Sequence, residues 1–64
     1  MGRGFLSIKK KSALNTYLET WFDEGNENEY VKDIHDRVVA GDDITTEEGE
    51  TVIGILGYDP LEGV

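Results

Sequence analysis

The stretch AGDDITTEEGE, from Ala40 to Glu50, carries the residue types best suited to chemistry in this chain. It contains two aspartates and three glutamates together with two threonines and two glycines. Carboxylate and hydroxyl oxygens in such a run are typical of a calcium-binding loop. The same residues also cap and link two helices, or cover a solvated acidic surface. The sequence therefore has to be tested against a metal loop, a helix hairpin and an acidic binding surface.

A metal loop is suggested by the segment ITTEEGETVIGILGYDPLEG, which resembles the end of an EF-hand loop and its following helix in calmodulin-like proteins. When Ile44 is aligned with loop position eight, Glu48 falls at position twelve, where the motif has its last glutamate. The earlier positions, which need oxygen ligands or a glycine, hold Arg37, Val39, Gly41 and Asp42. The calcium-binding half of the motif is therefore missing, and we expect no metal site.

A helix hairpin fits the same residues better. The pattern VVAGDDITTEEGETVIGIL is similar to the helix–Gly–helix hairpin G-x-x-L-[ST]-x-E-E-A in the N-terminal helical domain of anthranilate phosphoribosyltransferases, with Gly49 in place of the alanine. The resemblance implies a local structure and no function, because nothing here resembles that family's catalytic domain. We expect Gly41 to end one helix in a left-handed turn, Asp42 and Asp43 to form the link, and Thr45 to begin the next helix.

Three helices are predicted, and the first, over residues 12–24, has the clearest pattern. Its apolar residues recur at helical spacing and form one stripe, namely Leu14, Tyr17, Leu18, Trp21 and Phe22. Ser12 is the predicted N-cap and Gly25 the residue that ends the helix. We expect Trp21 to be largely buried against Ile34, Val38, Val52 or Ile53, because so small a protein needs its aromatic rings in the core.

The second helix is predicted over residues 28–40 and the third over 46–56. Apolar residues mark the inner side of each, namely Val31, Ile34, Val38 and Val39 in one, and Val52, Ile53 and Leu56 in the other. Thr45 and Glu48 match a capping box, and Gly57 is expected to end the third helix. Gly49 and Gly54 weaken that helix, so we expect another backbone, of this chain or of a partner, to approach it closely there, with packing within the chain favoured.

The predicted fold is all-α: a compact three-helix bundle in a single domain of residues 1–64. A basic extended arm is expected over residues 1–11 and an irregular tail over 58–64. The arm and tail contain apolar residues beyond what three helices need, namely Phe5, Leu6, Ile8, Tyr58, Leu61 and Val64, to which Ile55 adds one from the third helix. A chain of 64 residues buries only about 60% of its unfolded surface, so its stability is marginal. These extra apolar residues therefore either add to the core or form a docking surface.

Charge is the strongest compositional signal. The net charge is −8, and from Ser12 onward Lys32 and Arg37 alone oppose all fourteen acids, for a net −12. Phosphates would be repelled by such a body, so direct nucleic-acid binding is disfavoured. There is no cysteine, and His35 is the only histidine, expected at the edge of the core. These residues predict neither cofactor nor catalysis, and we expect a non-enzymatic cytoplasmic protein without membrane association.

The predicted function is that of a small acidic protein-binding module. It would present carboxylates to a basic, nucleic-acid-binding surface of a host enzyme, and in size and charge it is similar to phage-encoded inhibitors such as anti-restriction proteins. The predicted contact residues surround the two turns between helices: Asp23, Glu24, Glu27 and Glu29, and Asp42, Asp43, Glu47 and Glu50. Two alternatives remain open: a structural or accessory subunit that docks through apolar contacts in a larger, virion-like assembly, and acids that only solubilise the protein.

Overall fold

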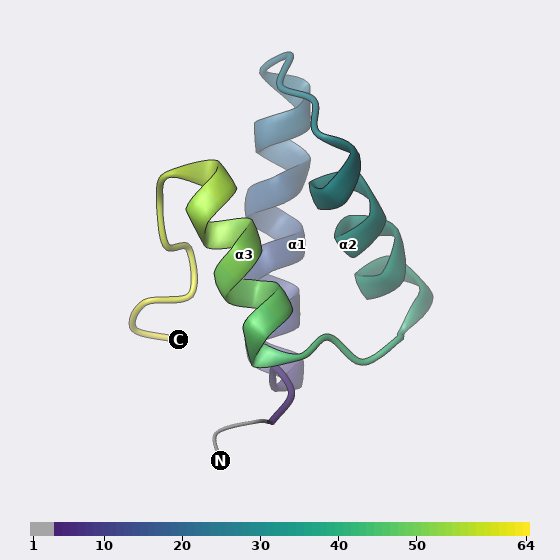
Figure 1. The fold of residues 1–64 in the computed structure, drawn as a ribbon, viewed down its shortest axis with the longest axis vertical. Helices are drawn as coiled ribbons and strands as arrows, with labels where there is room; N and C mark the ends of the chain where they lie inside the picture. The colour runs from purple at the N-terminus through teal and green to yellow at the C-terminus, as the bar shows by residue number, and fades with distance from the viewer. Residues whose placement is uncertain (1–3) are drawn as a thin grey trace.

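Three helices make up most of the chain in a computed structural model, which describes residues 4–64 (Figure 1). They are α1 (Ile8–Asp23), α2 (Glu29–Ala40) and α3 (Thr46–Leu56). Each runs opposite in direction to the one before it, and α2 packs against both α1 and α3. Within the described range no strand forms beyond one isolated antiparallel bridge, between Phe5 and Thr45. The predicted all-α three-helix fold is confirmed.

The first helix begins four residues earlier than predicted. Ser7, not Ser12, is its N-cap, and the Ser7 hydroxyl accepts a hydrogen bond from the Lys10 amide at 3.2 Å. The predicted arm of residues 1–11 was therefore too long, because Lys9 to Lys11 lie in the first turn of α1. Lysines near a helix N-terminus oppose the helix dipole, but this costs only about 0.3–1 kcal/mol. Good helix propensity and a suitable serine cap outweigh that cost.

The other helix ends follow the sequence signals. Gly25, Gly41 and Gly57 adopt left-handed backbone conformations, with φ of 94°, 87° and 73°, at the ends of α1, α2 and α3. This conformation suits glycine because it has no Cβ to clash with the backbone. Asn28 caps α2 by accepting the Val31 amide at 3.0 Å. The ends of α2 and α3 therefore lie within one residue of those predicted from the sequence.

The core draws on every element, and its buried residues are Leu6, Leu14, Leu18, Val31, Ile34, Ile44, Val52 and Leu61. The aromatic residues of the α1 stripe pack against this core but remain half-buried. Trp21 is among them, so it packs against the core as expected but is less buried than the aliphatic core residues. The last turn of α1 extends past the end of α3 in Figure 1, which leaves that end of the stripe partly uncovered.

The arm and tail complete the core on the outer side of α3. The Leu6 amide donates to the Ile44 carbonyl at 2.8 Å, and the Thr46 amide donates to the Gly4 carbonyl at 3.1 Å. Leu6 and Leu61 are buried, which corrects their prediction as surplus apolar residues available for docking. Phe5, Ile8, Ile55, Tyr58 and Val64 are exposed, as that prediction requires.

The two glycines inside α3 have different surroundings in the described chain. A Cβ at Gly49 would lie 3.3 Å from a methyl group of Leu6, so this glycine makes room for the side chain of the arm. A Cβ at Gly54 would meet nothing within 4 Å. Within residues 4–64 the expected approach of a backbone is therefore wrong at Gly54, and at Gly49 the close neighbour is a side chain. An approach by a partner's backbone stays a prediction.

Candidate functional site: the acidic hairpin between α2 and α3

The stretch from Ala40 to Glu50 forms a helix hairpin, as its glycine and threonine signals predicted. Gly41 ends α2, Asp42 and Asp43 form the link, and Thr45 is the N-cap of α3. Ile44 is fully buried and fastens the link to the core. The link is therefore fixed by one apolar anchor and two helix ends.

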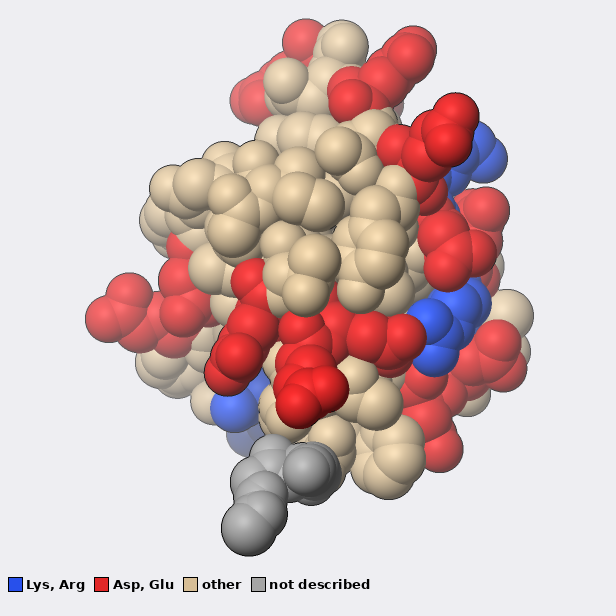
Figure 2. Space-filling model, in the orientation of Figure 1, with Lys and Arg blue, Asp and Glu red and all other residues tan. Residues whose placement is uncertain are grey.

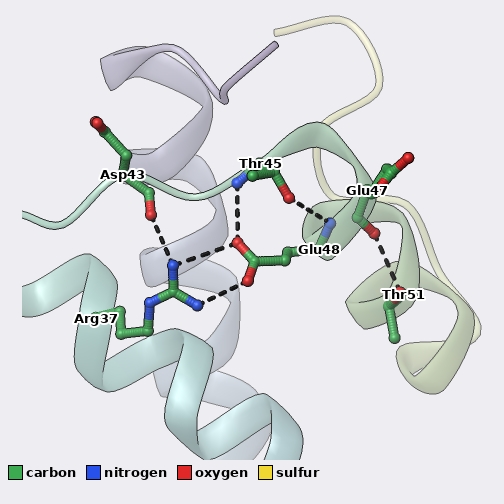
Figure 3. Close-up of polar contacts among 6 residues, drawn as sticks. All are labelled: Arg37, Asp43, Thr45, Glu47, Glu48 and Thr51. Atoms are coloured by element: carbon green, nitrogen blue, oxygen red, sulfur yellow. Dashed lines mark hydrogen bonds and ion pairs between the residues drawn. The ribbon is translucent and has the colours of Figure 1, made fainter. Parts of the chain in front are cut away.

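A complete capping box begins α3 (Figure 3). The Glu48 amide donates to the Thr45 hydroxyl at 3.0 Å, and the Thr45 amide donates to Glu48 Oε1 at 3.0 Å. These two bonds satisfy amides that a helix N-terminus otherwise leaves without partners. Glu48 is half-buried as a result, which agrees with its exclusion from the predicted contact residues.

Arg37 is the residue that the sequence analysis missed. Its guanidinium donates to Glu48 Oε2 at 2.8 Å and Oε1 at 3.3 Å, and also to the Asp43 carbonyl at 2.9 Å (Figure 3). The hydrogen bond from Arg37, followed by that from the Thr45 amide, lowers the pKa of Glu48 below its usual value. The same hydrogen bond with Glu48 raises the pKa of Arg37. No local spacing rule pairs these side chains, because they are eleven residues apart on different helices.

Segments from elsewhere in the chain also hold the link. The Lys11 ammonium donates to the Asp42 carbonyl at 3.2 Å. The N-terminal arm pairs with Ile44 and Thr46 through the two backbone hydrogen bonds described above. Three consecutive carbonyls, those of Asp42, Asp43 and Ile44, thus accept hydrogen bonds from residues outside the hairpin link.

The remaining acids of the hairpin face solvent. Asp42, Asp43, Glu47 and Glu50 are all exposed, as predicted. Figure 3 shows the carboxylates of Asp43 and Glu47 directed away from Arg37. No ion pair within residues 4–64 involves any of the four. We call these four residues the hairpin acids; they are available carboxylates on a backbone that the rest of the fold holds in place.

The second predicted group, Asp23, Glu24, Glu27 and Glu29, is also exposed and lies around the turn between α1 and α2. We call these residues the tip acids. The two groups lie at opposite ends of α2, and a helix of 12 residues spans about 18 Å. The structure therefore does not bring the two predicted groups together into one site.

A shallow depression of about 770 Å³ lies beside the tip, lined in part by Phe22, Lys32 and His35. His35 is half-buried with its ring edge-on to Phe22, at a centroid distance of 5.5 Å, which agrees with its expected place at the edge of the core. Its Nε2 atom is buried and neither accepts nor donates a hydrogen bond within the described chain. The depression holds one histidine without a second soft ligand.

The remaining findings limit the chemistry of the described chain. Among residues 4–64, no group of three or more histidine, cysteine, aspartate or glutamate side chains is placed to hold a metal ion. None of the three helices in this range has the length and apolar character needed to cross a bilayer. Comparison of the chain with protein-family models, curated protein sequences and solved structures found no match.

Proposed function

We propose that this protein is a small acidic protein-binding module whose hairpin acids engage a basic surface of a partner. The partner is a host enzyme that binds nucleic acid, and the module inhibits it by occupying its groove, in the manner of phage-encoded nucleic-acid mimics. The observation that carries the proposal is the group of four exposed carboxylates, none in an ion pair with residues 4–64, on a backbone held from several sides. The proposal assigns no catalysis to the module.

The charge balance supports attraction to a basic partner. Two ion pairs form among residues 4–64: Arg37 with Glu48, and an exposed pair in which Lys32 Nζ lies 3.7 Å from Asp36. The other carboxylates form no ion pair within that range, although Arg37 and Lys11 lie near Asp42 and reduce its field in part. A surface of one sign accelerates encounter with a surface of opposite sign and repels nucleic acid itself.

A hairpin backbone that is already ordered before binding favours a higher affinity for the partner. A binding loop that must become ordered loses conformational entropy on association, at about 0.5–1.5 kcal/mol for each immobilised side chain. Here the link backbone is already held by Arg37, Lys11 and the N-terminal arm. Only the carboxylate rotamers remain to be ordered, so more of the electrostatic attraction is retained as binding free energy.

The test begins with capture of partners from the native cell on the immobilised protein, identified by mass spectrometry. Affinity for a captured partner is then measured for the wild type and for a variant with Asp42→Asn, Asp43→Asn, Glu47→Gln and Glu50→Gln. We expect this hairpin variant to bind at least about tenfold more weakly, since a few desolvated charge pairs each contribute more than 1.4 kcal/mol. Wild-type binding should weaken as salt rises, and duplex DNA should compete for the partner.

The tip acids provide a matched control. Replacing Asp23, Glu24, Glu27 and Glu29 by their amides removes the same charge at the other end of α2. The tip variant should bind within about threefold of the wild type. Equal binding by the hairpin variant and the wild type, without salt dependence, would contradict the proposal.

A second candidate function rests on exposed apolar side chains. Phe5, Ile8, Tyr58 and Val64 are largely exposed in the arm, the start of α1 and the tail. Apolar exposure of this kind favours an accessory subunit that docks in a larger assembly. Binding that is indifferent to salt but lost on replacement of Tyr58 by serine would select this function.

A further inference from the structure

Aromatic side chains gather on the side of the molecule where α2 and α3 frame α1. The rings of Tyr17 and Tyr58 stack with their centroids 5.2 Å apart and their planes at 29°. Trp21 lies one helical turn beyond Tyr17 on the same side of α1 and is half-buried. Tyr58 itself is 58% exposed. The C-terminal half of α1 and the start of the tail therefore share one partly open aromatic surface.

Residues of α2 and α3 extend this surface. Arg37 and Glu48 join the facing sides of these antiparallel helices. Tyr30 precedes Arg37 by seven residues and Ile55 follows Glu48 by seven, so each lies about two turns away on the same facing side. Their exposed fractions are 38% and 39%. We call Tyr17, Trp21, Tyr30, Ile55 and Tyr58 the apolar face.

Carboxylates surround the apolar face. Figure 2 shows one continuous area without charged groups over the upper part of α3 and toward α2, with acidic groups along its lower margin and mostly acidic groups, among a few basic ones, along its right margin. On α2, Asp33 lies one turn from Tyr30, and on α3, Glu47 lies about two turns before Ile55. Both acids are exposed. The surface is thus apolar at its centre and anionic along margins contributed by two helices.

The apolar centre and acidic margins of this face favour some binding partners over others. A second copy of the chain would bring a net charge of −8 against the same charge. Nucleic acid and anionic membranes carry the same unfavourable sign. An amphipathic helix with a narrow apolar stripe and lysine or arginine on both flanks matches both the apolar centre and the anionic margins.

We propose that the apolar face is the docking site for a basic amphipathic helix of a partner protein. The helix lies across the surface of the apolar face, with its apolar stripe on Trp21, Tyr30 and Ile55 and its basic flanks toward Asp33 and Glu47. This inference rests on the proposed function for the positive charge of the partner, and it adds the element of the partner that is recognised. Trp21 is the only tryptophan, so its fluorescence reports directly on occupancy.

The first experiment uses a synthetic helical peptide of about 18 residues, with leucines at i, i+3, i+4 and i+7 and lysines elsewhere. The comparison peptide has the same composition in scrambled order. We expect saturable binding of the amphipathic peptide with a shift of Trp21 emission to shorter wavelength, and affinity at least about tenfold weaker for the scrambled peptide. No saturable binding, or equal binding of the two peptides, overturns the proposal.

The second experiment removes the apolar face without touching the core. A variant with Tyr30→Ser and Ile55→Ser should lose at least about tenfold in affinity for the amphipathic peptide, while its circular dichroism stays that of the wild type. Its matched control carries Ile8→Ser and Val39→Ser, at positions 82% and 65% exposed. By helical spacing these lie on the opposite sides of α1 and α2 from Tyr17 and Tyr30, so the control should bind like the wild type.

A variant with only Asp42→Asn, Asp43→Asn and Glu50→Gln, which keeps Glu47, separates this inference from the function on which it rests. If the Tyr30→Ser and Ile55→Ser variant binds the peptide normally and this three-amide variant does not, the docking site is wrong and the acid-driven function survives. If the serine variant loses binding and the three-amide variant does not, the docking site is upheld and the function assigned to the hairpin acids fails. Self-association in sedimentation experiments that the two serines abolish would assign the face to a second copy and overturn the proposal.

Discussion

The hairpin acids and the tip acids are alike in composition and exposure, but their backbones are held differently. In the hairpin, Lys11 and Arg37 bind consecutive carbonyls, and the arm pairs with the residues that follow. At the tip, the Asn26 side-chain amide donates to the Trp21 carbonyl at 2.9 Å and Asn28 caps α2. The hairpin is therefore held by distant segments, and the tip by its own neighbours.

This difference has a consequence for stability and for binding. Local hydrogen bonds form without the rest of the fold, so the tip depends little on tertiary packing. The hairpin is fixed only when the arm, α1 and α2 are all in place, because each supplies one of its hydrogen-bonding partners. A fixed acidic surface thus requires a folded chain, and mutations that loosen the fold should affect the hairpin before the tip.

The largest expected effect comes from the apolar anchor of the hairpin. Ile44→Ala removes a fully buried side chain and should lower the free energy of unfolding by about 2–5 kcal/mol, enough to unfold much of so small a protein. Trp21→Ala, at the tip end of α1, should cost less because Trp21 is half-buried. Urea denaturation followed by circular dichroism compares the two variants. A larger loss for Trp21→Ala would reverse the comparison of the two regions.

A smaller effect is expected from the helix caps. Thr45→Ala in the hairpin and Asn28→Ala at the tip each remove one acceptor for a helix amide, so each should cost about 1 kcal/mol. The two sites share no partner and lie at opposite ends of α2, so the costs should add in the double variant. Thermal and urea denaturation measure all three proteins. A departure from additivity beyond about 0.5 kcal/mol would show that the two regions are coupled.

The smallest effect concerns pH and the pair of Arg37 with Glu48. Because the pKa of Glu48 is lowered in the folded protein, the pair stabilises the fold above the usual glutamate pKa of about 4.3. That stabilisation is lost as pH falls through the lower folded-state pKa. The coupling of Arg37→Gln and Glu48→Gln in a double-mutant cycle should therefore be favourable at neutral pH and vanish in strong acid. A coupling that persists unchanged at low pH would rule out this electrostatic contribution.

The local features of the fold were readable in the sequence because they follow from short-range chemistry. Thr45 and Glu48 form a capping box, and Gly41 and Gly57 end helices, wherever the flanking residues favour helix. The start of α1 was misplaced because Ser7 and Ser12 can both cap a helix and the apolar stripe pointed only to Ser12. When two serines can each cap the same helix, only the packing of the folded chain decides which of them does so.

The sequence by itself determined the helical periodicity, the two glycine-terminated links and the excess of negative charge, since each depends on residue type and spacing along the chain. Tertiary structure decided which distant residues meet. It placed Arg37 on Glu48, Leu6 over Gly49 and Tyr17 against Tyr58, contacts between segments that no periodic pattern relates. It also left Trp21 half-buried, because the extent to which α3 covers α1 is a property of the packed fold.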